Sequence, residues 1–213
     1  MTAYFGDVAA LARKDLLLEL RSRDTVPALL LFVVSALVVF RFALPADASD
    51  LAATGLLWIA VLFTGLLALT RAFVPEREQR TLDGLVLAPC DRSAIWLGKG
   101  ISVLAFLVLV EALALPAFAL FFAPVSGSTV AAFALADVGI ATVGTLLAAM
   151  AAASRARELL LPLLFLPLAI PVVVGGVGAS VEPDPGRYLA FLGLYDLLFA
   201  ILAWATFEYV VTE

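Results

Sequence analysis

Long apolar segments alternate with short polar segments along most of the chain. Six segments are mostly apolar over about 18 residues or more, the length that an α-helix needs to cross the hydrocarbon core of a bilayer. The predicted spans are Val26–Leu44, Leu51–Phe73, Ile101–Phe122, Val130–Ala152, Leu159–Ala179 and Tyr188–Val211. These segments are too long for the strands of a membrane β-barrel and do not alternate in polarity. The pattern predicts an all-α integral membrane protein with six spans.

The composition agrees with a membrane protein. The chain is 64% hydrophobic and 15% charged, whereas a soluble domain is roughly half apolar and a quarter charged. It has no histidine, so the commonest metal ligand is missing, and its one cysteine, Cys90, excludes an internal disulfide. The net charge of −5 argues against a nucleic-acid partner.

Basic residues are distributed unevenly between the two sets of loops. Eleven of the 13 lysines and arginines precede the first span or flank the loops after the second and fourth spans, and only Arg41 and Arg187 lie on the other side. Because basic residues favour cytoplasmic loops, we expect a multi-pass protein of the cytoplasmic (inner) membrane with both termini in the cytoplasm.

Residues 1–25 are too charged to span, and charges continue to Asp24, so no cleavable signal peptide is expected. As a helix, this segment gathers Asp7, Arg13, Lys14 and Arg21 on one side and Val8, Leu11, Ala12 and Leu16 on the other. That pattern is typical of a helix lying in the membrane interface. Asp15 and Glu19 interrupt its apolar face, and an ordinary lead-in to the first span is the alternative.

A charged segment, residues 74–100, separates the second and third spans. Pro75 and Pro89 suit the start and end of a short helix, and Glu76 and Glu78 suit the dipole of its first turn. Leucines recur at helical spacing on one strip, and the other charges project elsewhere. We expect Asp91 to cap a second helix that continues into the third span. The first helix is predicted to present its charges to the cytosol and to dock a soluble partner; a solvated loop is the alternative.

Three stretches carry a resemblance to a known family: GLLWIAVLFTGLLALTRAFVPEREQRTLDGLVLAPCDRSAIWLGK, KDLLLELRSRD and LPLLFLPLAIPVVV. They resemble the CcmB family, the heme exporter protein B permeases of cytochrome c maturation. The likeness covers nearly the whole chain. It implies that residues 1–213 form one ABC permease transmembrane domain.

The resemblance also implies partners and a coupling helix. Two copies would pair with two copies of a CcmA-like ATPase that binds ATP and Mg, beside CcmC-like and CcmD-like membrane subunits. The complex would export heme or release a heme-loaded chaperone, with no cofactor bound directly by this chain. The implied ATPase-docking residues are Glu76, Arg77, Glu78, Arg80, Thr81, Leu82, Asp83, Leu85 and Pro89.

The residues themselves favour a mechanical, non-catalytic subunit. The chain contains no GxxxxGK[ST] phosphate-binding loop, so ATP hydrolysis is expected in another chain. Without histidine, and with its cysteine on the cytoplasmic side, the chain is a poor donor of heme ligands. No nucleophile–base pair or metal-binding cluster is apparent, so we do not expect an enzyme.

Two features inside the spans are candidates for function. Glu111 lies in the third span and is read either as a carboxyl group that changes protonation during a transport cycle or as a protonated acid that bonds a neighbouring helix. The fifth span contains Pro162, Pro167 and Pro171, followed by Gly175 and Gly176, and is expected to bend or break. It is read either as a gate or re-entrant turn or as a static kink.

The leading interpretation is therefore a permease subunit of an ABC complex. One alternative is a proton-coupled secondary transporter that uses Glu111 and needs no ATPase. The other is a membrane scaffold that transports nothing and only anchors partners.

Overall fold

The computed structural model describes residues 2–22, 25–45, 50–74, 76, 90–154 and 156–212. Within these residues the chain forms seven helices and no strand. The helices are α1 (Thr2–Ser22), α2 (Thr25–Ala43), α3 (Asp50–Arg71), α6 (Arg92–Phe121), α7 (Gly127–Ala153), α8 (Arg157–Val181) and α9 (Gly186–Thr212). All except α1 are long and apolar enough to cross a membrane, which confirms the predicted all-α, six-span fold.

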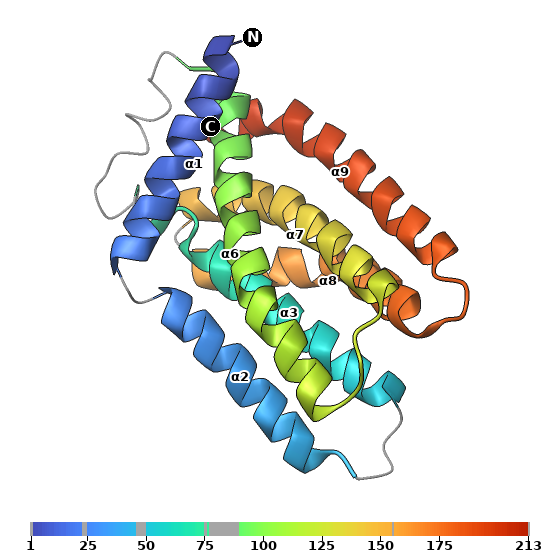
Figure 1. Cartoon of the computed structure of the whole chain (residues 1–213). Coiled ribbons are helices and arrows are strands. Elements are labelled where there is room, and N and C mark those ends of the chain that lie inside the picture. The colour runs from blue at the N-terminus through green and yellow to red at the C-terminus, as the bar shows by residue number, and fades with distance from the viewer. Residues whose placement is uncertain are drawn as a thin grey trace.

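The six long helices form an antiparallel bundle, and α7 lies at its centre (Figure 1). Of the apolar stretch of α7, 67% is buried inside the bundle, against 17% for α2 and 22% for α9 at its edges. Helix α1, which is too polar to span, packs alongside the first part of α6. One end of the bundle carries α1, the start of α6 and the end of α9, and we call it the terminus side. We call the opposite end the far side.

The third span begins earlier than its apolar pattern predicts. Helix α6 starts at Arg92 instead of Ile101, and Asp91 caps it by accepting a hydrogen bond from the Ser93 backbone N–H at 2.9 Å. The predicted cap is thus confirmed. The extension is stable because its polar groups bond within the protein: the Trp96 indole N–H, for example, donates to the Thr142 carbonyl at 3.2 Å.

Helix α8 does not break at its prolines. It is continuous from Arg157 to Val181 with Pro162, Pro167 and Pro171 inside it, so a break and a re-entrant turn are wrong, whereas a bend or static kink stays a prediction. Packing of α8 against α3, α7 and α9 allows a helix to continue where proline has removed a backbone bond.

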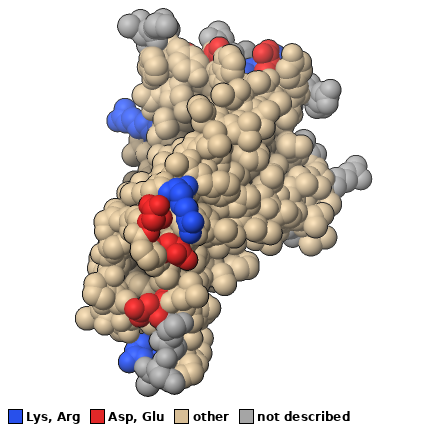
Figure 2. All heavy atoms as spheres, turned by 90° about the vertical axis from the view of Figure 1, so that its right-hand side faces the viewer, with Lys and Arg blue, Asp and Glu red and all other residues tan. Residues whose placement is uncertain are grey.

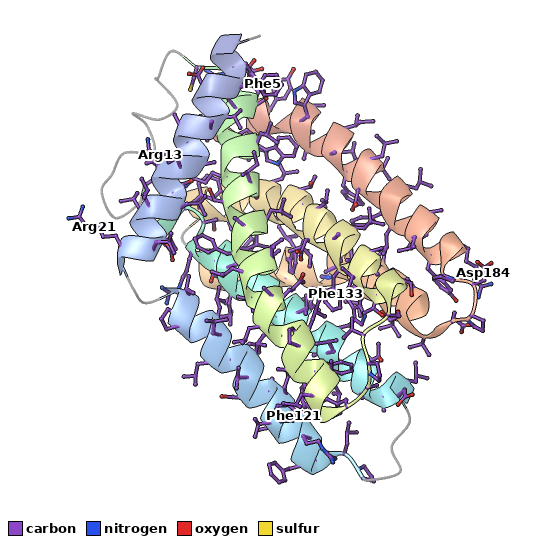
Figure 3. All side chains as sticks on the ribbon, in the orientation of Figure 1. Phe5, Arg13, Arg21, Phe121, Phe133 and Asp184 are labelled. Carbon is purple, nitrogen blue, oxygen red and sulfur yellow. The ribbon has the colours of Figure 1, made fainter. Side chains whose placement is uncertain are left out.

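The glycines that follow these prolines make room for large side chains. A methyl group on Gly176 would lie 2.3 Å from the Trp58 ring, and one on Gly175 would lie 2.8 Å from Leu192. Trp58 is buried, stacks on Phe133 at a centroid distance of 4.3 Å and donates to Ser180 at 3.2 Å. Figure 3 shows Phe133 inside the bundle. The structure therefore gives Gly175 and Gly176 a packing role, and gating at this segment stays a prediction.

The outer surface suits a lipid environment. The face seen in Figure 2 is mostly uncharged, and α9 exposes Leu194, Leu197, Leu198 and Ile201 along its length. Phe42 on α2 and Leu120 on α6 are also exposed. Arg13 and Arg21 of α1 lie on the terminus side, whereas Asp184 lies in the far-side loop between α8 and α9 (Figure 3).

Candidate functional site

Most of the predicted ATPase-docking segment lies outside the described residues. This part contains Arg77, Glu78, Arg80, Thr81, Leu82, Asp83, Leu85 and Pro89. Glu76, at its start, is described, and it does not face the solvent. Its side chain is 2% exposed, whereas the sequence pattern predicted that the charges of this segment are presented to the cytosol. That expectation is wrong for Glu76.

Glu76 is buried because it pairs with two lysines from different helices. Its Oε2 atom lies 2.8 Å from the Nζ of Lys99 on α6, and its Oε1 atom lies 2.5 Å from the Nζ of Lys14 on α1. Both contacts are also hydrogen bonds. One carboxylate therefore connects the chain beyond α3 to both α1 and α6.

Asp15 completes this group on the other side of Lys99. Its Oδ2 atom lies 3.0 Å from Lys99 Nζ, and its Oδ1 atom lies 3.0 Å from Lys14 Nζ. Lys99 is only 3% exposed; it also donates to the Ala72 carbonyl at 2.7 Å and lies 4.9 Å from the centre of the Phe73 ring. We call Lys14, Asp15, Glu76 and Lys99 the charge cluster.

The charge cluster holds two acids and two bases, and this pairing shifts the pKa values of Glu76 and Lys14. Burial alone would raise the pKa of Glu76, but the charge of Lys99 and the hydrogen bonds from both lysines outweigh burial and lower that pKa from its ordinary 4.5. Burial alone would lower the pKa of Lys14, but the hydrogen bond to Glu76 and the charges of both acids raise it above its ordinary 10.5. Glu76 and Lys14 are therefore both charged throughout the neutral range.

Close packing of α1 on α6 places the cluster. Val8 and Ala12 of α1 are buried, and a methyl group on Gly98 of α6 would lie 2.8 Å from Leu11. Ser102 of α6 donates to the Ala12 carbonyl at 3.2 Å. The interruption of the apolar face at Asp15 now has a cause, because Asp15 faces the buried base Lys99 rather than lipid.

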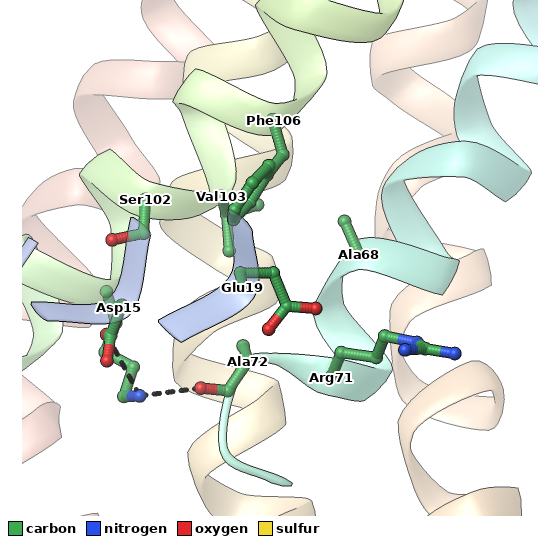
Figure 4. Close-up of a pocket in the computed structure, with 9 residues that line it drawn as sticks. Asp15, Glu19, Ala68, Arg71, Ala72, Ser102, Val103 and Phe106 are labelled. Carbon is green, nitrogen blue, oxygen red and sulfur yellow. Dashed lines mark hydrogen bonds and ion pairs between the residues drawn. The ribbon is translucent and has the colours of Figure 1, made fainter. Parts of the chain in front are cut away.

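A small cavity of about 30 Å³ adjoins the charge cluster. Its lining includes Asp15, Lys99, Glu19 and Arg71, and Figure 4 shows the carboxylate of Glu19 between the end of α1 and the end of α3. A cavity of this size has room for one or two water molecules but not for a substrate. The cluster and its cavity are therefore a junction between segments rather than a ligand pocket.

A second group of buried acids lies inside the bundle. Glu111 is 7% exposed, and Asp137 on α7 and Asp196 on α9 are 0% and 7% exposed. The carboxyl groups of Glu111 and Asp137 lie close enough for their charges to interact. We call Glu111 and Asp137 the carboxyl pair; it places the predicted candidate Glu111 beside a second acid on a neighbouring helix.

Sequence reasoning found single members of both groups and missed their partners. It gave no partner to Lys14 or Asp15, and it did not pair Lys99 with any acid. The overlooked signals were an acid on the apolar face of the first helix, and acids at similar depths in the third and fourth spans.

Comparison with known proteins gives one consistent result. The family model described as "CcmB protein" matches residues 7–208. The "Heme exporter protein B" of Bradyrhizobium diazoefficiens is 31% identical over 81% of this chain and 80% of its own length. The proteins of that name from Rhodobacter capsulatus and Paracoccus denitrificans are 32% and 30% identical, over 78% and 93% of this chain and 79% and 94% of their own lengths.

Proposed function

Because the chain belongs to the CcmB family, we propose that it is the membrane permease subunit of an ABC-type complex that serves cytochrome c maturation. In this proposal a separate CcmA-like chain binds ATP and Mg and hydrolyses the nucleotide. CcmC-like and CcmD-like subunits and a second copy of this chain complete the complex. The complex handles heme or a heme-loaded chaperone, and this chain supplies movement rather than chemistry.

The proposed orientation places the terminus side in the cytoplasm. The basic bias of the loops supports it, since Arg13, Arg21 and Arg92 belong to this side. The segment after α3 then lies where a soluble ATPase can reach it. Arg77 and Arg80 of this segment are proposed to contact the ATPase.

The charge cluster is the observation that supports coupling. A push on the segment beyond α3 moves a helix bundle only if the segment is firmly attached to that bundle. Glu76 provides that attachment, because it is buried and bonds Lys99 on α6 and Lys14 on α1. Motion of the segment is therefore proposed to pass to α6, which crosses the membrane, and to α1.

Co-purification tests this function. The tagged chain is extracted from its native membrane in mild detergent, its partners are identified by mass spectrometry, and ATP hydrolysis is measured. We expect a CcmA-like ATPase and a CcmC-like subunit, and loss of the ATPase in the double variant Arg77→Glu, Arg80→Glu. A matched control is Arg13→Glu, which changes an exposed charge of α1 outside the charge cluster.

The alternative functions give different results in the same experiment. A proton-coupled secondary transporter that uses Glu111 would purify without an ATPase and still transport. A scaffold would bring partners but tolerate Glu111→Ala and Pro167→Ala without functional loss. Retention of the ATPase by the double variant would contradict docking through Arg77 and Arg80.

A further inference from the structure

The carboxyl pair lies in the interior of the spanning bundle. Glu111 is ten residues before the last residue of α6, and Asp137 is ten residues after the first residue of α7. Asp196 is also ten residues after the first residue of α9. At 1.5 Å per residue, all three acids lie about 15 Å from the far-side ends of their helices. They therefore form one layer near the middle of a hydrocarbon core about 30 Å thick.

No base accompanies the acids in this layer. The lysines and arginines of the six described spanning helices lie towards helix ends, with Lys99 the deepest of those on α6. On α2, α3 and α8, the described ionisable side chains occur only near an end. Helix α9 contributes Asp196, which faces Gly139 of α7, and Tyr195, whose hydroxyl donates to the Leu168 carbonyl at 2.7 Å.

Oxygen atoms of the carboxyl pair also lack donors. Among the described residues, no hydrogen-bond donor reaches Glu111 Oε1 or either carboxyl oxygen of Asp137. An unpaired negative charge at membrane depth is costly, and two such charges in contact repel each other strongly in a medium of low dielectric constant. The arrangement therefore requires a bound positive species that fits between two carboxyl groups.

A proton fits this position better than a metal ion. A hard cation takes about six or more oxygen ligands, and the helical carbonyls around the pair are already used in backbone hydrogen bonds. No group of three or more His, Cys, Asp or Glu among the described residues is arranged to hold a metal. A proton needs only one donor oxygen and one acceptor oxygen, which the pair supplies.

We propose that Glu111 and Asp137 form a proton-binding site that connects α6 to α7. With the proton bound, the carboxylic acid O–H of Glu111 donates to a carboxyl oxygen of Asp137, which stays ionised. When the proton leaves for water, two carboxylates face each other and their repulsion separates the helices at this depth. Proton occupancy is therefore linked to α6–α7 packing, and this link does not depend on an ATPase partner.

Infrared spectroscopy of the purified full chain in lipid nanodiscs tests the site directly, because neutral and ionised carboxyl groups absorb at different frequencies. At neutral pH, where exposed carboxyl groups are ionised, we expect a neutral-carboxyl band in the wild type. The band should change in Glu111→Gln and in Asp137→Asn and lose the pair's contribution in the double variant. Glu208→Gln is the matched control, because Glu208 is an exposed acid that pairs with Arg92 at 3.0 Å.

A chemical label identifies the residue without any substitution. Dicyclohexylcarbodiimide modifies protonated carboxyl groups in apolar surroundings, and peptide mass spectrometry locates the adduct. We expect the adduct on Glu111 or Asp137 in the wild-type chain and none on Glu208. A neutral-carboxyl band that is absent, or that only Asp196→Asn removes, would overturn the proposal, as would a wild-type chain that acquires no label on either member of the pair.

Discussion

The charge cluster and the carboxyl pair show two ways of burying acids in one membrane protein. In the charge cluster, Glu76 and Asp15 are neutralised by lysines within 3.0 Å. In the carboxyl pair, Glu111 and Asp137 face each other, and no described base is near them. The first arrangement has fixed charges at neutral pH and suits a permanent attachment. The second depends on a proton and suits a contact that forms and breaks.

Removing the buried base of the charge cluster should have the largest effect on stability. In Lys99→Met, Asp15 and Glu76 lose their buried partner, and the side chain of Lys14, which still pairs with both, is 40% exposed. We expect the free energy of unfolding in mixed detergent micelles to fall by about 3–5 kcal/mol. The control is Arg92→Met, on the same helix as Lys99. It removes the exposed pair with Glu208 of α9 and should cost about 0–1 kcal/mol. Equal losses of unfolding free energy in the two variants would show that burial of the charge cluster does not add to stability.

Acid should weaken the same cluster without any substitution. Because the folded-state pKa of Glu76 lies below its ordinary 4.5, its pairing stabilises the protein above that value, and the stabilisation is lost as pH falls through the folded pKa. The melting temperature, measured at a series of pH values, should therefore drop more steeply on acidification in the wild type than in Glu76→Gln. Parallel curves would mean that the ionised Glu76 side chain does not stabilise the folded protein. Above pH 10.5, deprotonation of Lys14 should weaken the cluster from the alkaline side.

Packing of α1 against α6 can be disturbed without changing any charge. In Gly98→Ala the new methyl group would lie 2.8 Å from Leu11 and 3.3 Å from the Val8 carbonyl, and we expect a cost of about 1–3 kcal/mol. Gly6→Ala on α1 is the control, because no atom lies within 4 Å of its new methyl group, and it should stabilise the helix by about 0.5–1 kcal/mol. Similar melting temperatures for both variants would contradict close packing at this contact.

The smallest effect is expected at the carboxyl pair. Glu111→Gln replaces a neutral acid by a neutral amide of similar shape, which still donates a hydrogen bond to Asp137. The free energy of unfolding at neutral pH should change by less than about 1 kcal/mol. A loss as large as that of Lys99→Met would mean that Glu111 is ionised in the folded protein, and the contrast between the two buried groups would fail.

The spans could be predicted from the sequence because apolar length is a local property. A run such as Val130–Ala152 needs no knowledge of its neighbours to be read as a spanning helix, and the Asp91 cap follows from the residues beside it. The burial of Glu76 could not be predicted from the residues beside it in the sequence. Its partners are Lys14 and Lys99, which are distant in the chain, and only the packing of α1 on α6 brings them together.

The prolines of α8 show that a local sequence rule can also mislead. The local rule that proline interrupts a helix predicted a bend or a break, yet the helix continues through Pro162, Pro167 and Pro171. Neighbouring helices hold the chain in place on several sides, and the glycines beyond the prolines allow those neighbours to approach closely. The equal depth of Glu111 and Asp137, by contrast, was readable from residue spacing once the helices were known to be antiparallel.

Replacement of Glu76 by glutamine tests the central claim most directly, because it removes one charge from the attachment between the segment after α3 and the bundle. ATPase co-purification and ATP-dependent formation of c-type cytochromes would be measured for Glu76→Gln and for the exposed control Glu208→Gln. We expect Glu76→Gln to keep the ATPase but to lower cytochrome formation by about fivefold or more, at the lower end of typical coupling energies, while the control matches the wild type. Wild-type output from Glu76→Gln would contradict coupling through the charge cluster.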